Sequence, residues 1–164
     1  MKISYRLVSW VMTISGTIGL GASFALAYDE HMMRTNPFYV PPCAVNEVVN
    51  YATVMNSPQS ELFGFPNPYG GLIAFSIVLA LGIGGIAGGC YARWLWNGLL
   101  AGLCVGSGFV FWFAYQSIFK IGSFCPYCVI TWACTLVLWG TILVFNRKSK
   151  NIQQPLTSAK SAPR

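Results

Sequence analysis

Four long stretches without a charged residue constrain this chain more than any other feature. A helix needs about 20 residues to cross a hydrocarbon layer of roughly 30 Å, and each stretch is long enough. They are residues 7–28, 62–92, 94–119 and 121–146. Backbone groups inside lipid must bond within their own segment, and the alternation typical of a membrane barrel is missing, so we expect helices.

The composition agrees with a membrane protein. Only 9% of the residues are charged and 55% are hydrophobic, whereas a soluble domain carries roughly 25% charged residues. We therefore predict an all-α membrane protein: a four-transmembrane-helix bundle in a domain of residues 1–146, followed by a polar, disordered tail at 147–164. The predicted spans are residues 7–27, 69–90, 97–118 and 126–145.

The charges predict how the chain is oriented. All four acidic residues lie between residues 28 and 68, while the basic residues concentrate at the two ends of the chain. Because cytoplasmic flanks of membrane helices are enriched in Lys and Arg, we expect both termini in the cytoplasm and the 28–68 segment outside. No basic patch interleaved with aromatic residues is present, so we expect no nucleic-acid partner.

The first span has an alternative interpretation. Lys2 and Arg6, the apolar stretch, and Ala25-Leu26-Ala27 resemble a signal peptide with a cleavage site. A signal core is usually about 7–15 residues, which is shorter than this stretch. We expect the segment to be retained as a span.

The outer segment 28–68 is too short to bury much core alone, and prolines interrupt it. Apolar residues recur at helical spacing over residues 43–56, which predicts a short helix there. We interpret the segment as an extracytoplasmic loop and short-helix cap over the outer end of the bundle.

Glycines recur every four residues in two of the spans. Small residues at this spacing let helices approach closely, so we expect packing contacts there, beside aromatic regions able to enclose a flat apolar ligand. These glycines are Gly98, Gly102 and Gly106 in the third span, and the pairs Gly84/Gly88 and Gly85/Gly89 in the second.

Two of the six cysteines form a Cys-x-x-Cys pair, Cys125 and Cys128, at the outer start of the fourth span. Three others, Cys90, Cys104 and Cys134, lie in or near the spans, where a free cysteine usually acts as a small hydrophobic residue. The sixth, Cys43, lies in the outer segment, where disulfides persist.

The position of the pair predicts reactivity. Residues i and i+3 of a helix lie on one face, and the partial positive charge at a helix N-terminus favours a thiolate. Pro126 suits an early helical position, and Lys120 adds positive potential. A structural zinc usually needs four ligands, so we predict redox chemistry rather than a metal site or an inert disulfide.

A dithiol at a membrane edge can exchange with thiol proteins outside and with quinones dissolved in the bilayer. Trp132 lies one turn after Cys128 on the same helical face and can line an apolar quinone pocket. The alternative for Trp132 is a side chain that packs only against lipid or helices.

The combination of features resembles the vitamin K epoxide reductase family, and Trp132 resembles its bacterial branch. The features are four spans, CPYC at the start of the last, and a loop with Cys43-Ala-Val-Asn46, Ser57-Pro-Gln59 and Phe63-Gly64-Phe65-Pro66-Asn67-Pro68. The resemblance covers roughly residues 8–145. It implies a membrane oxidoreductase that binds a quinone (menaquinone or ubiquinone) and no metal.

The resemblance also implies roles for individual residues. Cys128 faces the quinone, Cys125 is its partner, and Cys43 is the first cysteine of an outer relay. Phe63, Gly64, Phe65 and Asn67, together with Trp132, shape the quinone pocket. The partner of a bacterial member is a thioredoxin-like thiol oxidase, here a separate protein outside a bacterial-type plasma membrane, where it supports disulfide formation.

One departure from the family concerns the outer relay. A second loop cysteine is typical at the position that Tyr51 occupies here. Three interpretations remain open: Cys43 exchanges directly with Cys125, the partner exchanges directly with Cys125, or the relay is impaired.

Other functions remain alternatives at this point. A thiol-driven reductase of vitamin K or its epoxide has the same architecture. A membrane metal carrier would pass a soft ion between the Cys125 and Cys128 thiolates, and a structural membrane subunit would not depend on either cysteine. A second group of quinone-linked thiol oxidases places its Cys-x-x-Cys after the first span, which is the reverse of the order here.

Overall fold

The chain folds into four long helices in the computed structural model, which describes residues 5–36, 38–39, 66–121 and 125–160. The helices are α1 (Tyr5–Thr35), α3 (Asn67–Ile86), α4 (Arg93–Gln116) and α5 (Pro126–Lys160), and a short π-helical turn η2 (Ser117–Ile121) extends α4. All four are long and apolar enough to cross a membrane. The described residues contain no strand, so the prediction of an all-α membrane protein with four spanning helices is confirmed.

The second span ends earlier than predicted, at Ile86 rather than residue 90. A glycine-rich turn stops the helix: Gly88 takes a φ of 95°, and the N–H of Gly89 donates to the carbonyl of Gly84 at 2.9 Å. A left-handed residue after the last turn is a common helix stop, and glycine adopts it without a steric penalty.

The outer segment begins later than predicted, because α1 continues to Thr35 instead of ending before residue 28. Two acidic residues, Asp29 and Glu30, therefore lie within the helix and are buried. Glu30 pairs with Arg34 one turn later at 2.9 Å, and the Tyr39 hydroxyl donates to Asp29 at 2.7 Å. These partners offset the cost of burying two carboxylates.

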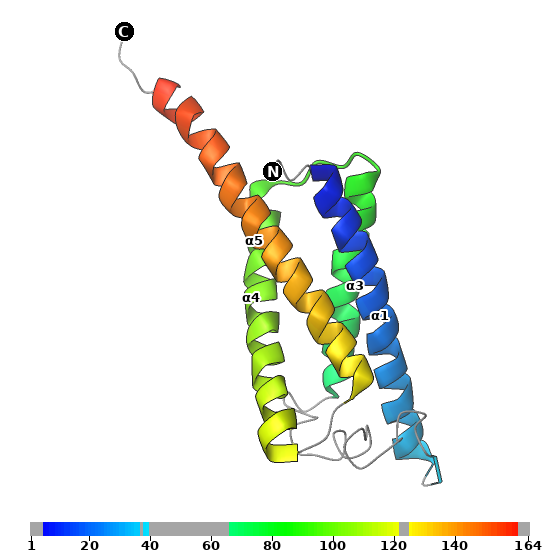
Figure 1. The fold of residues 1–164 in the computed structure, drawn as a ribbon. Helices are drawn as coiled ribbons and strands as arrows, with labels where there is room; N and C mark the ends of the chain where they lie inside the picture. The colour runs from blue at the N-terminus through cyan, green and yellow to red at the C-terminus, as the bar shows by residue number, and fades with distance from the viewer. Residues whose placement is uncertain (1–4, 37, 40–65, 122–124, 161–164) are drawn as a thin grey trace.

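The predicted disordered tail also differs from the structure, because α5 continues to Lys160. Figure 1 shows this end of α5 projecting beyond the other helices.

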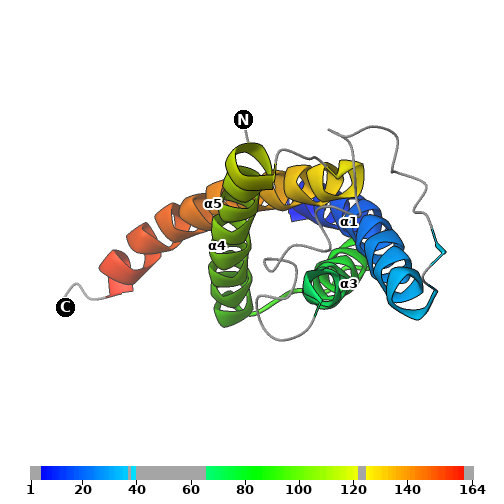
Figure 2. The same ribbon diagram turned by 90° about the horizontal axis from the view of Figure 1, so that it is seen from below.

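The helices pack as a chain of neighbours rather than as a closed square. α1 packs closely against α3 and also against α5, and α5 packs against α4. Figure 2, seen along the bundle, shows α3 and α4 separated, with α1 and α5 on one side of both. The main core cluster takes side chains from all four helices: Val8, Met12, Phe75, Val78, Trp96, Leu103, Cys134, Leu138 and Ile142.

Aromatic and polar contacts join the helices at one end of the bundle. Tyr5 packs edge-on against Trp96 at a ring distance of 5.9 Å, and Trp96 lies 4.8 Å from Phe145. The Tyr5 hydroxyl donates to the carbonyl of Gly89 at 2.5 Å. We call this the basic end, because the bases beside these residues are Arg6, Arg93, Arg147 and Lys148.

The start of α1 and the C-terminal half of α5 lie at the basic end, and the start of α5 lies at the opposite end (Figure 1). The start of α3 is also at that opposite end, because α1 and α3 run antiparallel. The cap predicted over this end, including the helix at 43–56, lies outside the described residues.

Candidate active site

Cys125 and Cys128 lie at the N-terminus of α5. Pro126 is the first helical residue, as expected, and the carbonyl of Cys125 accepts the N–H of Val129 at 3.2 Å. Cys125 thus precedes the helix directly, where the N–H groups of the first turn have no partner inside the helix. Both thiols are free in the structure, so the pair is described in its reduced form.

Cys125 is the more deeply enclosed of the two residues, with 2% of its surface exposed. It packs against Leu26 of α1, and Met33, Tyr127 and Cys128 surround this contact. A hydrogen bond from the Cys128 thiol lowers the pKa of Cys125; burial opposes this, and the backbone N–H groups of Cys128 and Tyr127 add to the lowering. The thiolate, which is the nucleophilic form, is therefore favoured at Cys125.

A partly open cavity of about 640 Å³ lies between α3 and α4, and residues of α1 and α5 also line it. This size is within the range of small-molecule sites, about 300–1,000 Å³. α5 contributes Cys128 at one end of the cavity and Leu138 much deeper. Aromatic side chains, including Phe75 and Phe109, and aliphatic side chains form most of the wall, so the cavity suits an apolar ligand.

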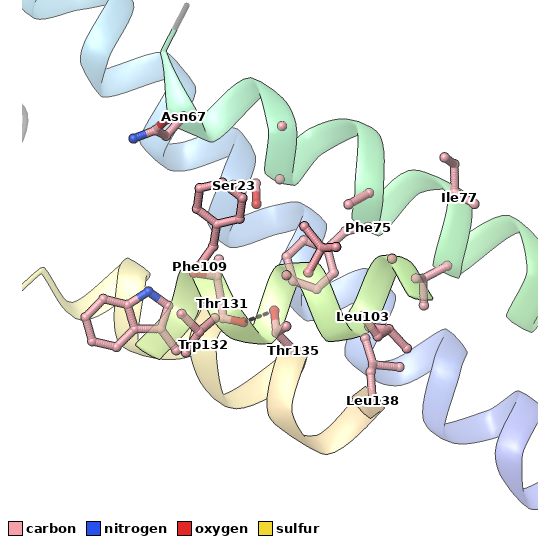
Figure 3. Close-up of a pocket in the computed structure, with 18 of the residues that line it drawn as sticks. Ser23, Asn67, Phe75, Ile77, Leu103, Phe109, Thr131, Trp132, Thr135 and Leu138 are labelled. Atoms are coloured by element: carbon pink, nitrogen blue, oxygen red, sulfur yellow. Dashed lines mark hydrogen bonds between the residues drawn. The ribbon is translucent and has the colours of Figure 1, made fainter. Parts of the chain in front are cut away.

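The few polar side chains of the cavity gather toward the end that contains Cys128. Figure 3 shows Asn67 and Trp132 at that end of the cavity, while Ile77, Leu103 and Leu138 lie toward the other. The remaining polar lining residues are Ser23, Ser117, Thr131 and Thr135, and Trp94, which is the exception because it lies next to Arg93 at the basic end. A flat ring with polar groups therefore fits the end near Cys128, and an apolar chain fits the rest.

Hydrogen bonds hold the first turns of α5. The hydroxyl of Thr131 donates to the carbonyl of Cys128 at 2.8 Å, and the hydroxyl of Thr135 donates to the carbonyl of Thr131 at 2.8 Å. Both donors are thus used within the helix, and only the hydroxyl oxygens face the cavity as acceptors.

The structure brings some of the predicted site residues together. Cys128, Trp132 and Asn67 all line the cavity, and Cys125 lies behind Cys128 without lining it. The predicted site residues Cys43, Phe63, Gly64 and Phe65 lie outside the described residues, as does Tyr51. Lys120 is in η2 and exposed, not in a loop.

The packing role predicted for the third-span glycines is wrong for two of them. A methyl group added at Gly98 or Gly102 would meet nothing within 4 Å, and both residues line the cavity. At Gly106 the nearest atom, Cγ2 of Thr135, is at 3.6 Å, an ordinary contact. Gly98 and Gly102 thus border the open space of the cavity instead of bringing two helices together.

Sequence reasoning missed Phe75 and Ser23 as cavity residues. Phe109 belongs to the aromatic regions expected to enclose a flat apolar ligand, and it does line the cavity. The available signal was the row of small and aromatic residues on α4, in which Gly98, Gly102 and Phe109 share one face. Within the described residues, no group of three or more His, Cys, Asp or Glu side chains is placed to hold a metal ion.

Comparison with protein families is consistent with this arrangement. The family model described as "Vitamin K epoxide reductase family" matches residues 10–143, a range that includes both cysteines of the pair and the cavity wall. A comparison with curated proteins gave no match. Since the family model covers most of the sequence, the chain belongs to the vitamin K epoxide reductase family and is a multi-pass membrane oxidoreductase that acts between thiols and quinones.

Proposed function

We propose that this protein takes electrons from protein thiols outside the cytoplasm and passes them through Cys125 and Cys128 to a membrane quinone, which supports disulfide bond formation. One observation carries the proposal: Cys128 lines an apolar cavity, while Cys125 lies outside that cavity against the end of α1. In this proposal Cys128 reacts with a ligand in the cavity, and Cys125 reacts with a partner that approaches from outside the cavity.

The cavity fits a quinone in size and in lining. In this proposal Asn67 hydrogen-bonds to the ring near Cys128, Trp132 stacks on it, and Phe75 and Phe109 form apolar wall; the support is that all four residues line the cavity. When the bond between the two Sγ atoms forms, the pair releases two electrons together with the protons that its thiols carry, and a quinone held in the cavity would take them up.

Cys125 is the thiol proposed to exchange with the outer partner. Its lowered pKa favours the thiolate, which is the form that attacks a disulfide. We propose Cys43 as the donor to Cys125, since Tyr51 replaces the usual second loop cysteine. The partner is then a separate thioredoxin-like protein that exchanges with Cys43.

The proposed orientation places the start of α5 outside and both termini in the cytoplasm. The bases Arg6, Arg93, Arg147 and Lys148 flank one end of the helices. Asp29 and Glu30 lie toward the other end, near Cys125. This asymmetry agrees with the excess of Lys and Arg on cytoplasmic flanks. We propose a bacterial-type plasma membrane with the active site at its outer face.

The test is quinone reduction by the purified protein in detergent, with a small dithiol as donor and with menaquinone and ubiquinone analogues assayed in parallel. We expect turnover by the wild type and its loss in Cys128→Ser. Cys90→Ser is the control, because Cys90 is exposed near the basic end and does not line the cavity. No turnover by the wild type with either quinone would overturn the proposal.

A further inference from the structure

A buried carboxylate lies beside the redox pair on the outer part of α1. Asp29 is 5% exposed, and it follows Leu26 by one turn and precedes Met33 by one turn on the same helical face. Leu26 and Met33 both belong to the cluster around Cys125. Asp29 therefore lies on the α1 face that packs against the start of α5.

The Asp29 carboxyl accepts a hydrogen bond from the segment that follows α1. The hydroxyl of Tyr39 donates to Oδ1 of Asp29 at 2.7 Å, an ordinary length for an O–H···O hydrogen bond. This hydrogen bond to the carboxylate raises the pKa of Tyr39 to about 12. A tyrosinate is disfavoured there, because it would lose that bond and face a second negative charge.

The charge of Asp29 acts on Cys125. The carboxylate raises the pKa of the Cys125 thiol, which partly offsets the lowering by Cys128. Two negative charges close together disfavour each other, and burial strengthens the effect because the local dielectric is low. The disulfide form of the pair has no charge and does not feel this repulsion.

We propose that Asp29 sets the reduction potential of the Cys125/Cys128 pair, lowering it so that the pair gives up its electrons more readily to the quinone. The inference rests on the proposed function, because it assigns Asp29 a part in the direction of electron flow. Asp29 is a positioning residue that acts through Cys125, and it does not line the cavity.

The sign of the effect follows from the charge balance of the reaction. Reduction of the disulfide breaks the Sγ–Sγ bond and takes up two electrons. At a pH above the pKa of Cys125 it takes up one proton, on Cys128, and leaves a thiolate on Cys125. A nearby carboxylate destabilises only this reduced form, so the potential falls. Below that pKa both thiols are neutral and the effect disappears.

The other titratable groups in this region of the described chain do not replace Asp29. Glu30 is equally buried, but it forms an ion pair with Arg34 at 2.9 Å, so its charge has a partner of opposite sign. The groups that face Asp29 or its partner Tyr39 come from α1, the segment after it and α5: Tyr28, Glu30, Arg34, Tyr39, Cys125, Tyr127 and Cys128.

The test is a redox titration of the full-length purified protein in glutathione buffers. The oxidation state of Cys125 and Cys128 is read by differential alkylation and peptide mass spectrometry. Asp29→Asn keeps the acceptor for Tyr39 but removes the charge. We expect its dithiol/disulfide equilibrium to shift about tenfold toward the dithiol above the pKa of Cys125, which is about 30 mV for a two-electron couple.

Two control variants separate charge from structure. Glu30→Gln neutralises a carboxylate at the next position and should leave the potential unchanged, while Asp29→Glu keeps a charge and should restore most of the wild-type potential. We expect the potentials of wild type and Asp29→Asn to converge at acidic pH. Equal potentials across the whole pH range, or an equal shift in Glu30→Gln, would overturn the role of Asp29.

Quinone reduction by the wild type, measured on the same preparation, keeps the two proposals apart. Wild-type turnover together with an unchanged potential in Asp29→Asn contradicts the inference about Asp29 alone. A shifted potential without any wild-type turnover contradicts the proposed function and leaves the electrostatic effect of Asp29 established.

Discussion

Glycines line both the face between α1 and α3 and the face between α3 and α4, but the two faces differ in how tightly the helices pack. Between α1 and α3 the glycines are in close contact: a methyl group at Gly16 would lie 3.0 Å from the backbone of Leu79, and one at Gly82 would lie 2.7 Å from the backbone nitrogen of Thr13. Between α3 and α4, Gly98 and Gly102 border open space. Small residues thus serve helix packing on one face and ligand volume on the other.

On the close face, the antiparallel helices α1 and α3 meet at a series of contacts, and each contact contains at least one small residue. Gly85, Gly82, Leu79, Phe75 and Gly71 of α3 meet Ser9, Thr13, Gly16, Gly19 and Ser23 of α1 in reverse order. The α1 hydroxyls need no partner on α3, because Ser9 donates to the carbonyl of Tyr5 and Thr13 to that of Ser9. Close van der Waals packing drives association where lipid removes the hydrophobic effect.

The largest effect expected from this comparison is on the close face. Gly82→Val places a branched side chain against the backbone of Met12 and Thr13, which cannot move aside as a flexible side chain would. We expect a loss of about 2 kcal/mol in the free energy of unfolding, as is usual for overpacking. Thermal unfolding in detergent measures it, with Gly102→Val as the matched substitution on the open face. Equal losses in both variants would remove the distinction between the faces.

An effect of intermediate size is expected for filling the open face. Gly102→Leu projects a side chain into the cavity, and we expect the KM for quinone to rise about tenfold, or about 1.4 kcal/mol, with little change in thermal stability. Gly108→Leu is the control, since Gly108 is exposed on α4, does not line the cavity and has no neighbour within 4 Å. A similar rise in KM for both variants would show that the cavity is not the quinone site.

The smallest effect concerns the attachment of α4, which packs closely on α5 but not on α3. The buried amide of Asn146 donates to Oδ1 of Asn97 at 3.0 Å and joins these two helices. Asn146→Ala should cost about 0.6 kcal/mol, the average for interhelical hydrogen bonds in membrane proteins. Chemical unfolding of the variant in detergent measures this cost. A loss as large as that of Gly82→Val would mean that α4 depends on this bond far more than on packing.

The sequence by itself determined the membrane class, the four helices and the place of the reactive pair. Each of these depends on local properties: uncharged length, the need of a backbone in lipid to bond internally, and the start of a helix at Pro126. The predicted ends of two helices were less accurate. α1 is longer than predicted because Asp29 and Glu30 find side-chain partners within or after it, and α3 is shorter because a turn at Gly88 stops it.

Only the tertiary structure decided which faces meet. In a soluble helix the apolar stripe points to the core, but a membrane helix is apolar all round, so its sequence does not indicate which face packs. For this reason the glycines of α4 could not be distinguished from those of α1 and α3 before the helices were placed. The same holds for Asp29, because its proximity to Cys125 depends on how α1 and α5 are rotated against each other.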